Sequence, residues 1–286
     1  MAPLVGLSTA SVYPESTAHA FVWAAELGYD AVEVMVGIDA LSQQVTAVRQ
    51  LSEHHGVPVC AVHAPCLLFT QRVWGVEPWG KLQRSAEMAH AVGADVVVVH
   101  PPFRWQKEYA AGFVDGIAAL EASTGIAFAV ENMYPWRASS RRGMEMYLPG
   151  RDPSTDDYAN MTVDLSHAAI ARDDVVAMAL RMGDRLRHVH LTDGSGSAKD
   201  EHLVPGRGIM DADGFCRHLA ASGYDGHVVL EINTRRCTDR AEREVDLRES
   251  LEFARTHLAS PTAPGGGAGP DGSSDGSAGH PGRRSR

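Results

Sequence analysis

Short hydrophobic runs alternate with segments of helical period along most of this chain. The runs are rich in β-branched side chains, which is typical of parallel strands buried on both faces. They lie near Leu4–Ser8, Ala31–Val36, Pro58–His63, Asp95–His100, Ile126–Glu131, Met161–Asp164, Leu186–Leu191 and His227–Ile232. Helical spacing of apolar residues is found near Thr17–Leu27, Ser42–His55, Lys81–Val92, Tyr109–Ser123, Asp173–Met182, Ala212–Ser222 and Asp239–Leu258.

This order of strands and helices predicts the fold class. Repeated strand–helix units imply parallel strands joined by right-handed crossovers. Eight such units favour a single α/β domain, a closed (β/α)8 TIM barrel. An open doubly wound sheet is the alternative, but no glycine-rich phosphate loop follows the first strand. The segment from Tyr134 to Tyr158 is expected to be mostly loop.

The chain changes character after Leu258. Residues 259–286 contain no Leu, Ile, Val, Met or aromatic side chain and are dominated by Gly, Pro and Ser. Such a segment cannot bury enough apolar surface to offset its ordering entropy. We therefore expect a barrel over residues 1–258 and a disordered tail over 259–286 that ends in arginines.

Charge and cysteine content narrow the class of protein further. The chain has 26 Lys and Arg against 36 Asp and Glu, a formal net charge of −10. This net negative charge disfavours a nucleic-acid partner, although it does not exclude a local basic patch on the surface. The first Lys or Arg is Arg49, so no signal peptide is expected. No apolar run approaches the length of a membrane span, so none is expected either. Four cysteines without CxxC spacing indicate reduced thiols in a cytoplasmic protein.

Metal-binding side chains stand where the hydrophobic runs give way to polar residues. They are His63, His100, Glu131, Asp164, His167, His190 and Glu231. A carboxylate or imidazole at the carboxyl end of a barrel strand usually belongs to an active site rather than to the packed core. Inward carboxylates and histidines without a cation would suffer like-charge repulsion and desolvation. The pattern therefore predicts a metalloenzyme, and a barrel whose polar rim only binds a ligand is the alternative.

The alternation of side chains along a strand predicts which residues face the barrel interior. If Glu131 points inward, Ala129 does too, and Phe128 points toward the helices. The same rule places Ala127, Val96, Val98 and Val229 inside and Val130, Val228 and Leu230 outside. His188 shares a face with His190 but lies deeper. We expect His190 to be a ligand and His188 to be a hydrogen-bonded core histidine.

The polar loop DGSGSAKDEHLVPGRG after the seventh strand offers further candidates. Asp200 and His202 could both turn inward from an extended stretch, and a surface pair is the alternative. Gly206 and Gly208 flank Arg207, which would let the guanidinium reach an anionic or hydroxyl-rich group. A surface charge is an equal interpretation of Arg207.

Aromatic residues follow three of the predicted strands near the barrel mouth. They are Phe69, Trp74, Trp79, Phe103, Trp105, Tyr134 and Trp136. Sugar rings and extruded bases both pack against such faces. Packing of these side chains on each other is the alternative for at least half of them.

The motifs VHAP, VVVHP, VEN, VDLSH, HVHLTD, DEHLVPGRG and VVLEI occur in this order. As an ordered set they resemble the xylose isomerase-like barrel superfamily. That group includes sugar-phosphate isomerases and epimerases, ketose 3-epimerases and zinc-dependent AP endonucleases. The resemblance covers the chain up to about Leu258 and does not choose among these members.

The resemblance implies two overlapping sets of metal ligands. The set that holds one divalent ion in ketose epimerases corresponds to Glu131, Asp164, His190 and Glu231. The larger set of the endonucleases adds His63, His100, His167, Asp200 and His202. Carboxylate and imidazole ligands together suit Mn²⁺ or Zn²⁺ first, with Mg²⁺ and Co²⁺ as alternatives.

We therefore expect a divalent-metal-dependent isomerase or epimerase that acts on a sugar or sugar phosphate through an ene-diolate. Glu131 and Glu231 would transfer the proton. The expected substrate contacts are His167, Arg207, Trp105 and Trp136. A zinc-cluster phosphoesterase and a non-catalytic metal- or sugar-binding barrel are the alternatives. Homo-oligomer formation stays open.

Overall fold

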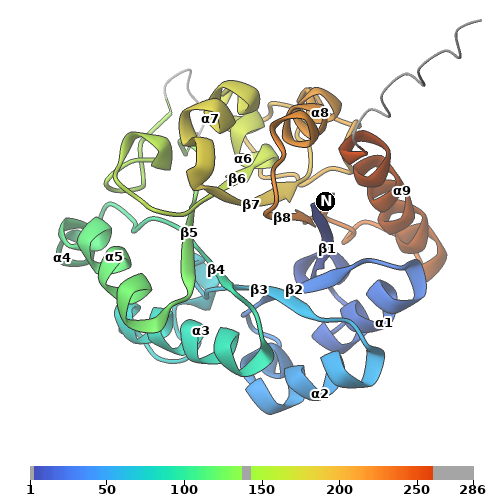
Figure 1. The fold of residues 1–286 in the computed structure, drawn as a ribbon, viewed down its shortest axis with the longest axis horizontal. Coiled ribbons are helices and arrows are strands. Elements are labelled where there is room, and N and C mark those ends of the chain that lie inside the picture. The colour runs from blue at the N-terminus through green and yellow to red at the C-terminus, as the bar shows by residue number, and fades with distance from the viewer. Residues whose placement is uncertain (1–2, 137–142, 260–286) are drawn as a thin grey trace, which may run out of the picture.

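The strands of this chain close into a barrel (Figure 1). The computed structural model describes residues 3–136 and 143–259. Within them, eight parallel strands are ordered β1 to β8 around the barrel, and β8 pairs with β1. The strands are β1 (Leu4–Ser8), β2 (Ala31–Met35), β3 (Val59–His63), β4 (Val96–Val99), β5 (Ala127–Glu131), β6 (Met161–Asp164), β7 (Leu186–Leu191) and β8 (His227–Leu230). The predicted (β/α)8 barrel is confirmed, and the open sheet is excluded.

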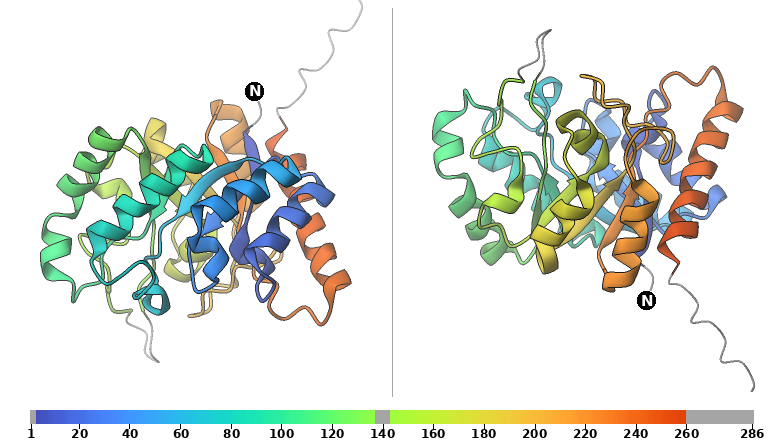
Figure 2. Two further views of the ribbon diagram at one scale, coloured as in Figure 1. Left: turned by 90° about the horizontal axis from the view of Figure 1, so that it is seen from below. Right: turned by 90° about the horizontal axis from the view of Figure 1, so that it is seen from above.

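Helices surround the strands on the outside of the barrel, as the side views of Figure 2 show. The α-helices are α1 (Thr17–Leu27), α2 (Val45–His55), α3 (Pro78–Val92), α4 (Lys107–Ala111), α5 (Phe113–Thr124), α6 (Leu165–Ala171), α7 (Val175–Met182), α8 (Ala212–Ser222) and α9 (Arg240–Leu258). Short 3-10 turns are η1 (Thr9–Val12), η2 (Ala40–Gln43), η3 (Leu68–Thr70), η4 (Pro153–Thr155) and η5 (Gly183–Arg185). Each strand is thus followed by a segment that returns the chain to the opposite end of the barrel.

Two helical segments differ from the sequence prediction. The single helix expected over Tyr109–Ser123 is two helices, α4 and α5, which meet at Gly112. Glycine is a poor helix former, so a break at this position is inexpensive. Helix α6 was not expected, because it is too short to display a helical period. It begins directly after β6, where the Asp164 carboxylate accepts a hydrogen bond from the His167 N–H at 2.7 Å.

The core consists of two apolar layers separated by the sheet. The outer layer lies between strands and helices and includes Phe128, Val130, Val228 and Leu230. The inner layer fills the barrel with Ala31, Cys60, Ala61, Val96, Val98, Ala129 and Val229, and Ala127 packs against it. The predicted alternation is therefore confirmed on β4, β5 and β8. Small inward side chains leave room for the polar groups at the carboxyl ends of the strands.

The remaining sequence predictions concern segments around the barrel. The segment Tyr134–Tyr158 carries only η4 and isolated bridges among its described residues, and residues 137–142 lie outside them. The predicted tail, 259–286, also lies outside the described residues beyond Ala259. Within 3–136 and 143–259, no helix has both the length and the hydropathy needed to cross a membrane.

Candidate metal centre

The carboxylate of Glu131 lies at the middle of a ring of imidazoles. Glu131 ends β5, and its side chain is 1% exposed. Its Oε2 is 2.9 Å from His100 Nε2 and 3.4 Å from His63 Nε2. Its Oε1 is 3.0 Å from His190 Nδ1 and 3.3 Å from His167 Nδ1. Five residues therefore meet at one point, four from the ends of β3, β4, β5 and β7 and one, His167, from helix α6 directly after β6.

Two further carboxylates approach His190 from neighbouring strands. Glu231 follows β8, and its Oε2 is 3.0 Å from His190 Nδ1. Asp164 ends β6, and its Oδ2 is 3.6 Å from the same nitrogen. Ligand atoms of Glu131, Asp164 and His190 all lie within 4.8 Å of one another. The four residues of the expected one-ion set are thus brought together.

The loop after β7 completes the cluster from the solvent side. Asp200 Oδ2 is 3.3 Å from His167 Nε2, and Asp200 Oδ1 is 3.1 Å from His202 Nε2. The Ser166 hydroxyl donates to Asp200 Oδ1 at 2.8 Å. Ligand atoms of Asp164, His167 and His202 lie within 4.8 Å of one another. Asp200 and His202 therefore turn inward, and the surface-pair interpretation of them is wrong.

Three of the histidines are oriented by the main chain. In each, Nδ1 lies at hydrogen-bond distance from a carbonyl oxygen, and Nε2 faces a carboxylate of the cluster. The Nδ1 of His167 also lies 3.3 Å from Glu131 Oε1. The pairs are His63 with Ala64 at 3.0 Å, His167 with Asn132 at 2.9 Å and His202 with Glu231 at 2.8 Å. His202 also has a left-handed backbone (φ 46°), which side chains other than glycine adopt at a cost. These features hold the imidazoles in place.

Opposite charges dominate the electrostatics of the cluster. Burial opposes ionisation of Glu131, but the His190 and His100 imidazoles hold its pKa well below its usual range. Burial likewise opposes protonation of His190, and the Glu231, Glu33 and Glu131 carboxylates raise its pKa well above the usual value. In the same way Asp164 and Asp200 outweigh burial and raise the pKa of His167 to about 10.

The donor set fits a divalent cation. Asp164 Oδ2 is buried without a hydrogen-bond partner among the described residues. Glu131 Oε2 lies close to two imidazoles yet accepts no well-aligned hydrogen bond within that part of the chain. Buried carboxylate oxygens of this kind are costly unless a cation or donors satisfy them. A divalent ion held by carboxylate oxygens and imidazole nitrogens would remove that cost.

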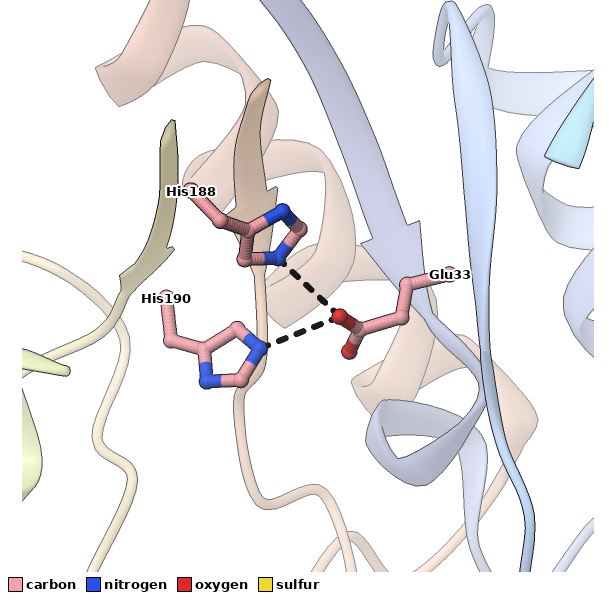
Figure 3. A group of neighbouring side chains, drawn as sticks. All are labelled: Glu33, His188 and His190. Atoms are coloured by element: carbon pink, nitrogen blue, oxygen red, sulfur yellow. Dashed lines mark hydrogen bonds and ion pairs between the residues drawn. The ribbon is translucent and has the colours of Figure 1, made fainter. Parts of the chain in front are cut away.

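Sequence reasoning missed one charged residue next to the cluster. Glu33 lies in β2 and is fully buried, and its Oε2 is 3.1 Å from His190 Nε2 and 3.0 Å from His188 Nε2 (Figure 3). His188 lies deeper in the barrel than His190 and is buried, as predicted, but neither of its ring nitrogens has a well-aligned hydrogen bond among the described residues. The signal that could have identified Glu33 is a carboxylate inside the hydrophobic run AVEVM.

A pocket of about 490 Å³ opens beside the cluster, between the loops that follow β3 and β4. His100 lies in its wall, so the pocket leads to the predicted ligands. Trp105 also lines it, is 49% exposed and stacks on Phe103 at 4.6 Å. Arg72 and Lys81 are the charged members of the described lining, which contains no carboxylate. The pocket therefore suits a neutral or anionic small molecule.

The other expected substrate contacts have different surroundings. Trp136 packs edge-on to Phe103 and Trp105, with ring centroids 6.1 and 6.2 Å apart. Arg207 forms ion pairs with α9, at 2.8 Å to Asp246 Oδ1 and 2.5 Å to Glu249 Oε2. Its guanidinium is 43% exposed, as in the surface-charge interpretation. Trp136 and Arg207 therefore have protein partners already.

Comparison with known proteins identifies relatives across most of the chain. The family model of the xylose isomerase-like TIM barrel matches residues 21–257. An uncharacterized protein of Mycobacterium tuberculosis is 52% identical over 272 residues, covering 89% of this chain and 97% of that protein. Fructoselysine 3-epimerase of Escherichia coli O157:H7 is 21% identical over 261 residues, covering 84% of this chain and 93% of the enzyme.

Solved structures share the fold at lower identity. A D-tagatose 3-epimerase-like protein superposes with a TM-score of 0.64 at 23% identity, covering 91% of this chain and all of that one. The 3-keto-D-glucoside 4-epimerase of Escherichia coli gives a TM-score of 0.66 at 20% identity, with coverages of 89% and 99%. At this identity the similarity concerns the barrel itself.

Proposed function

Because the chain belongs to the xylose isomerase-like TIM-barrel family, we propose that it is a divalent-metal-dependent isomerase or epimerase of a sugar or sugar phosphate. The observation that carries this proposal is the convergence of Glu131, Asp164, His190 and Glu231 at the carboxyl ends of β5 to β8. The similarity to fructoselysine 3-epimerase supports the same reaction class. Mn²⁺ and Zn²⁺ are the cations that best suit these ligands, followed by Mg²⁺ and Co²⁺.

The chemistry follows from two carboxylates beside the same imidazole nitrogen. A divalent ion bound there would polarise neighbouring carbonyl and hydroxyl oxygens of a sugar and make the C–H between them more acidic. Glu131 and Glu231 each have a carboxylate oxygen 3.0 Å from His190 Nδ1. One of them removes the proton and leaves an ene-diolate on the sugar. The other returns a proton, either to the opposite face or to the neighbouring carbon.

The pKa directions set the charge of the two carboxylates. Burial opposes ionisation of both groups, but neighbouring imidazoles lower the pKa of Glu131 and of Glu231. Both carboxylates are therefore ionised at neutral pH and can accept a proton. The substrate would reach them through the pocket lined by His100 and Trp105, where the indole offers a face for a sugar ring.

The first test is exchange of solvent deuterium into a panel of ketoses, aldoses and their phosphates. Replacing Glu131 or Glu231 with Gln keeps an oxygen ligand but removes the basic carboxylate. Each change should lower exchange by roughly two to four orders of magnitude, the range typical of general acid–base groups. Metal binding should weaken less in both variants than in His190→Ala, which loses a ligand.

The wild-type protein should exchange deuterium into at least one member of the panel. Exchange that persists in both Gln variants would contradict the roles of the two glutamates. Absence of exchange from every sugar tested, in metal-loaded wild-type protein, would contradict the isomerase proposal itself.

A second candidate, a zinc-cluster phosphoesterase, is favoured by the size of the cluster. Five residues lie beside the one-ion set, namely His63, His100, His167, Asp200 and His202. A single ion does not need nine protein ligands, and histidines favour Zn²⁺. Several clustered ions could instead activate water and stabilise the leaving oxygen of a phosphoester.

Counting metals separates the two candidates. Elemental analysis of protein purified without added metal should give about one ion per chain for the isomerase and two or three for the phosphoesterase. Cleavage of abasic-site DNA, together with two or three ions and no exchange into sugars, would replace the first proposal by the second. The formal net charge of −10 argues against a DNA substrate, because duplex binding depends on neutralising phosphates.

A further inference from the structure

Glu33 is the charged side chain directly below the candidate metal centre. It belongs to β2, on the other side of the barrel from β7, and is fully buried. A buried carboxylate costs several kcal/mol unless its charge is matched by close partners. Both partners of Glu33 in the described chain are histidines of β7, His188 and His190. Figure 3 draws the carboxylate facing the two rings.

His190 differs from the other histidines of the cluster in how its ring is held. His63, His167 and His202 each have Nδ1 beside a main-chain carbonyl oxygen. In His190 the contacts are reversed: Nδ1 faces the carboxylates of the centre, and Nε2 is 3.1 Å from Glu33 Oε2. Glu33 is the partner of Nε2 among the described residues. His190 therefore has a charged acceptor on the side away from the centre, whereas His63, His167 and His202 have a neutral main-chain oxygen.

This contact decides which nitrogen of His190 can bind a metal. A carboxylate only accepts, so Nε2 must carry the proton that it donates to Glu33. Nδ1 faces Glu131 Oε1 and Glu231 Oε2 at 3.0 Å each, so in metal-free protein it carries a proton too. A cation bound by those carboxylates would replace the proton on Nδ1, whereas Glu33 keeps the proton on Nε2. An acceptor on the distal nitrogen also makes the ligating nitrogen more basic.

We propose that Glu33 is a positioning residue that fixes the tautomer and the ring orientation of His190 for metal binding. The proposal rests on the proposed metal centre but does not depend on which substrate it serves. Glu33 itself does not touch the substrate pocket, because its contacts point to the interior of the barrel. Glu33 Oε1 is buried without a hydrogen-bond partner in the described part of the chain, so packing alone does not explain this carboxylate.

His188, which lies deeper in the barrel than His190, contacts the same carboxylate. Its Nε2 is 3.0 Å from the oxygen of Glu33 that also faces His190. The two rings stand edge to face, with centroids 5.1 Å apart and an interplanar angle of 88°. His188 thus keeps the carboxylate directed at β7. This gives a reason for a histidine at an inward position, since the apolar inner layer is made of Val, Ala and Cys60.

The test is a graded pair of variants with metal affinity as the readout. Glu33→Gln keeps an acceptor oxygen without its charge, and Glu33→Leu removes the acceptor. Titration of metal-free protein with Co²⁺, followed by the visible absorption band, should give roughly 10- to 100-fold weaker binding in Glu33→Leu. The loss in Glu33→Gln should lie between that of Glu33→Leu and wild type. Val96→Ala, which removes inner-layer volume on β4, is the control and should bind Co²⁺ as wild type does.

A second readout reports the ring itself. In ¹⁵N-histidine spectra of Zn²⁺-loaded protein, wild type should have an Nε2-bound proton on His190 that exchanges slowly with water. Glu33→Gln should retain that proton with faster exchange. If Glu33→Leu does not fold, the Glu33→Gln affinity and spectrum decide alone.

Several results would overturn the proposal. Wild-type affinity in Glu33→Gln, or equal losses in Glu33→Leu and Val96→Ala, would mean that Glu33 only packs. If a Glu33 variant bound one ion fewer than wild type and bound the remaining ions with unchanged affinity, Glu33 would be a metal ligand instead. Wild type that binds Co²⁺ but exchanges no sugar would contradict the isomerase and leave this test intact. Wild type that binds no divalent ion would contradict both before any variant is made.

Discussion

At the scale of single residues, protonation of His167, His190 and His202 would compete with the proposed metal binding. The Asp164 and Asp200 carboxylates outweigh burial and raise the pKa of His167 to about 10. Neighbouring carboxylates also raise the pKa of His190 and of His202 well above the usual value. Metal-free protein at neutral pH therefore holds these rings as imidazolium, and a cation must displace their protons.

We predict that metal binding releases protons and tightens as the pH rises from 6.5 toward 10, the ordinary and raised pKa values of His167. Calorimetric titration in buffers of different ionisation enthalpy measures the number of protons released. His190→Ala should release fewer protons than wild type. A proton count of zero at pH 7 would contradict the charge state described for the cluster.

The same pKa shifts predict how the metal-free fold responds to pH. A histidine whose folded-state pKa lies above its unfolded value stabilises the fold fully below that value, and this stability is lost as the pH rises through the folded pKa. For His167 the window is 6.5 to about 10. The melting temperature of metal-free protein should therefore fall between these pH values, whereas that of metal-loaded protein should not. A flat profile for the metal-free protein would contradict this expectation.

At the scale of elements, the loop after β7 depends on one buried carboxylate. Asp193 accepts hydrogen bonds from the N–H groups of Gly194, Gly206, Gly208 and Met210 at 2.8 to 3.1 Å. A Cβ on Gly208 would lie 2.2 Å from Asp193 Oδ1, so this position requires glycine. The same loop carries Asp200 and His202 to the cluster.

We predict that Asp193→Ala loosens this loop and weakens metal binding without removing a ligand. Four N–H groups would lose their acceptor, and each buried one costs about 1–3 kcal/mol. Hydrogen exchange over residues 194–209 should become faster, and metal affinity should fall. Glu201→Gln is the matched control, because Glu201 lies in the same loop but accepts from Ser195 at the loop surface and not from the N–H groups that Asp193 holds. Unchanged exchange in Asp193→Ala would show that the loop is held in another way.

At the scale of the whole molecule, the barrel is complete at Leu258. Helix α9 ends there, after packing beside α8 and against β1. Residues 259–286 have no large apolar side chain to add to either layer of the core. We predict that truncation after Ala259 changes neither the melting temperature nor the metal content. A decrease of several degrees on truncation would mean that the segment contributes to the folded protein.

The strand ends were predictable because they depend on local chemistry. A buried strand needs a hydrophobic run, and side chains alternate between its faces with a period of two. Ala129 and Val98 could therefore be assigned to the interior, and Glu131, Asp164 and His190 to one mouth of a barrel. The order of strands followed from the short right-handed crossovers that join them.

Helix α6 and the partners of Arg207 were not predictable in this way. Helix α6 is seven residues long, which is too short for a period, and its start is set by a cap from Asp164. The guanidinium of Arg207 faces either a ligand or the protein depending on where α9 lies. Only the packed molecule brings Asp246 and Glu249 next to it.

The sequence by itself thus determined the fold class, the inward faces and the set of candidate ligands at the carboxyl ends, because each is encoded within a few neighbouring residues. Tertiary structure alone decided how those groups pair. Glu33 and His190 are 157 residues apart and meet only because β2 and β7 face each other across a closed barrel. Side-chain pairing across the interior depends on closure and register. Closure and register cannot be inferred from the local hydrophobic pattern that predicts a strand.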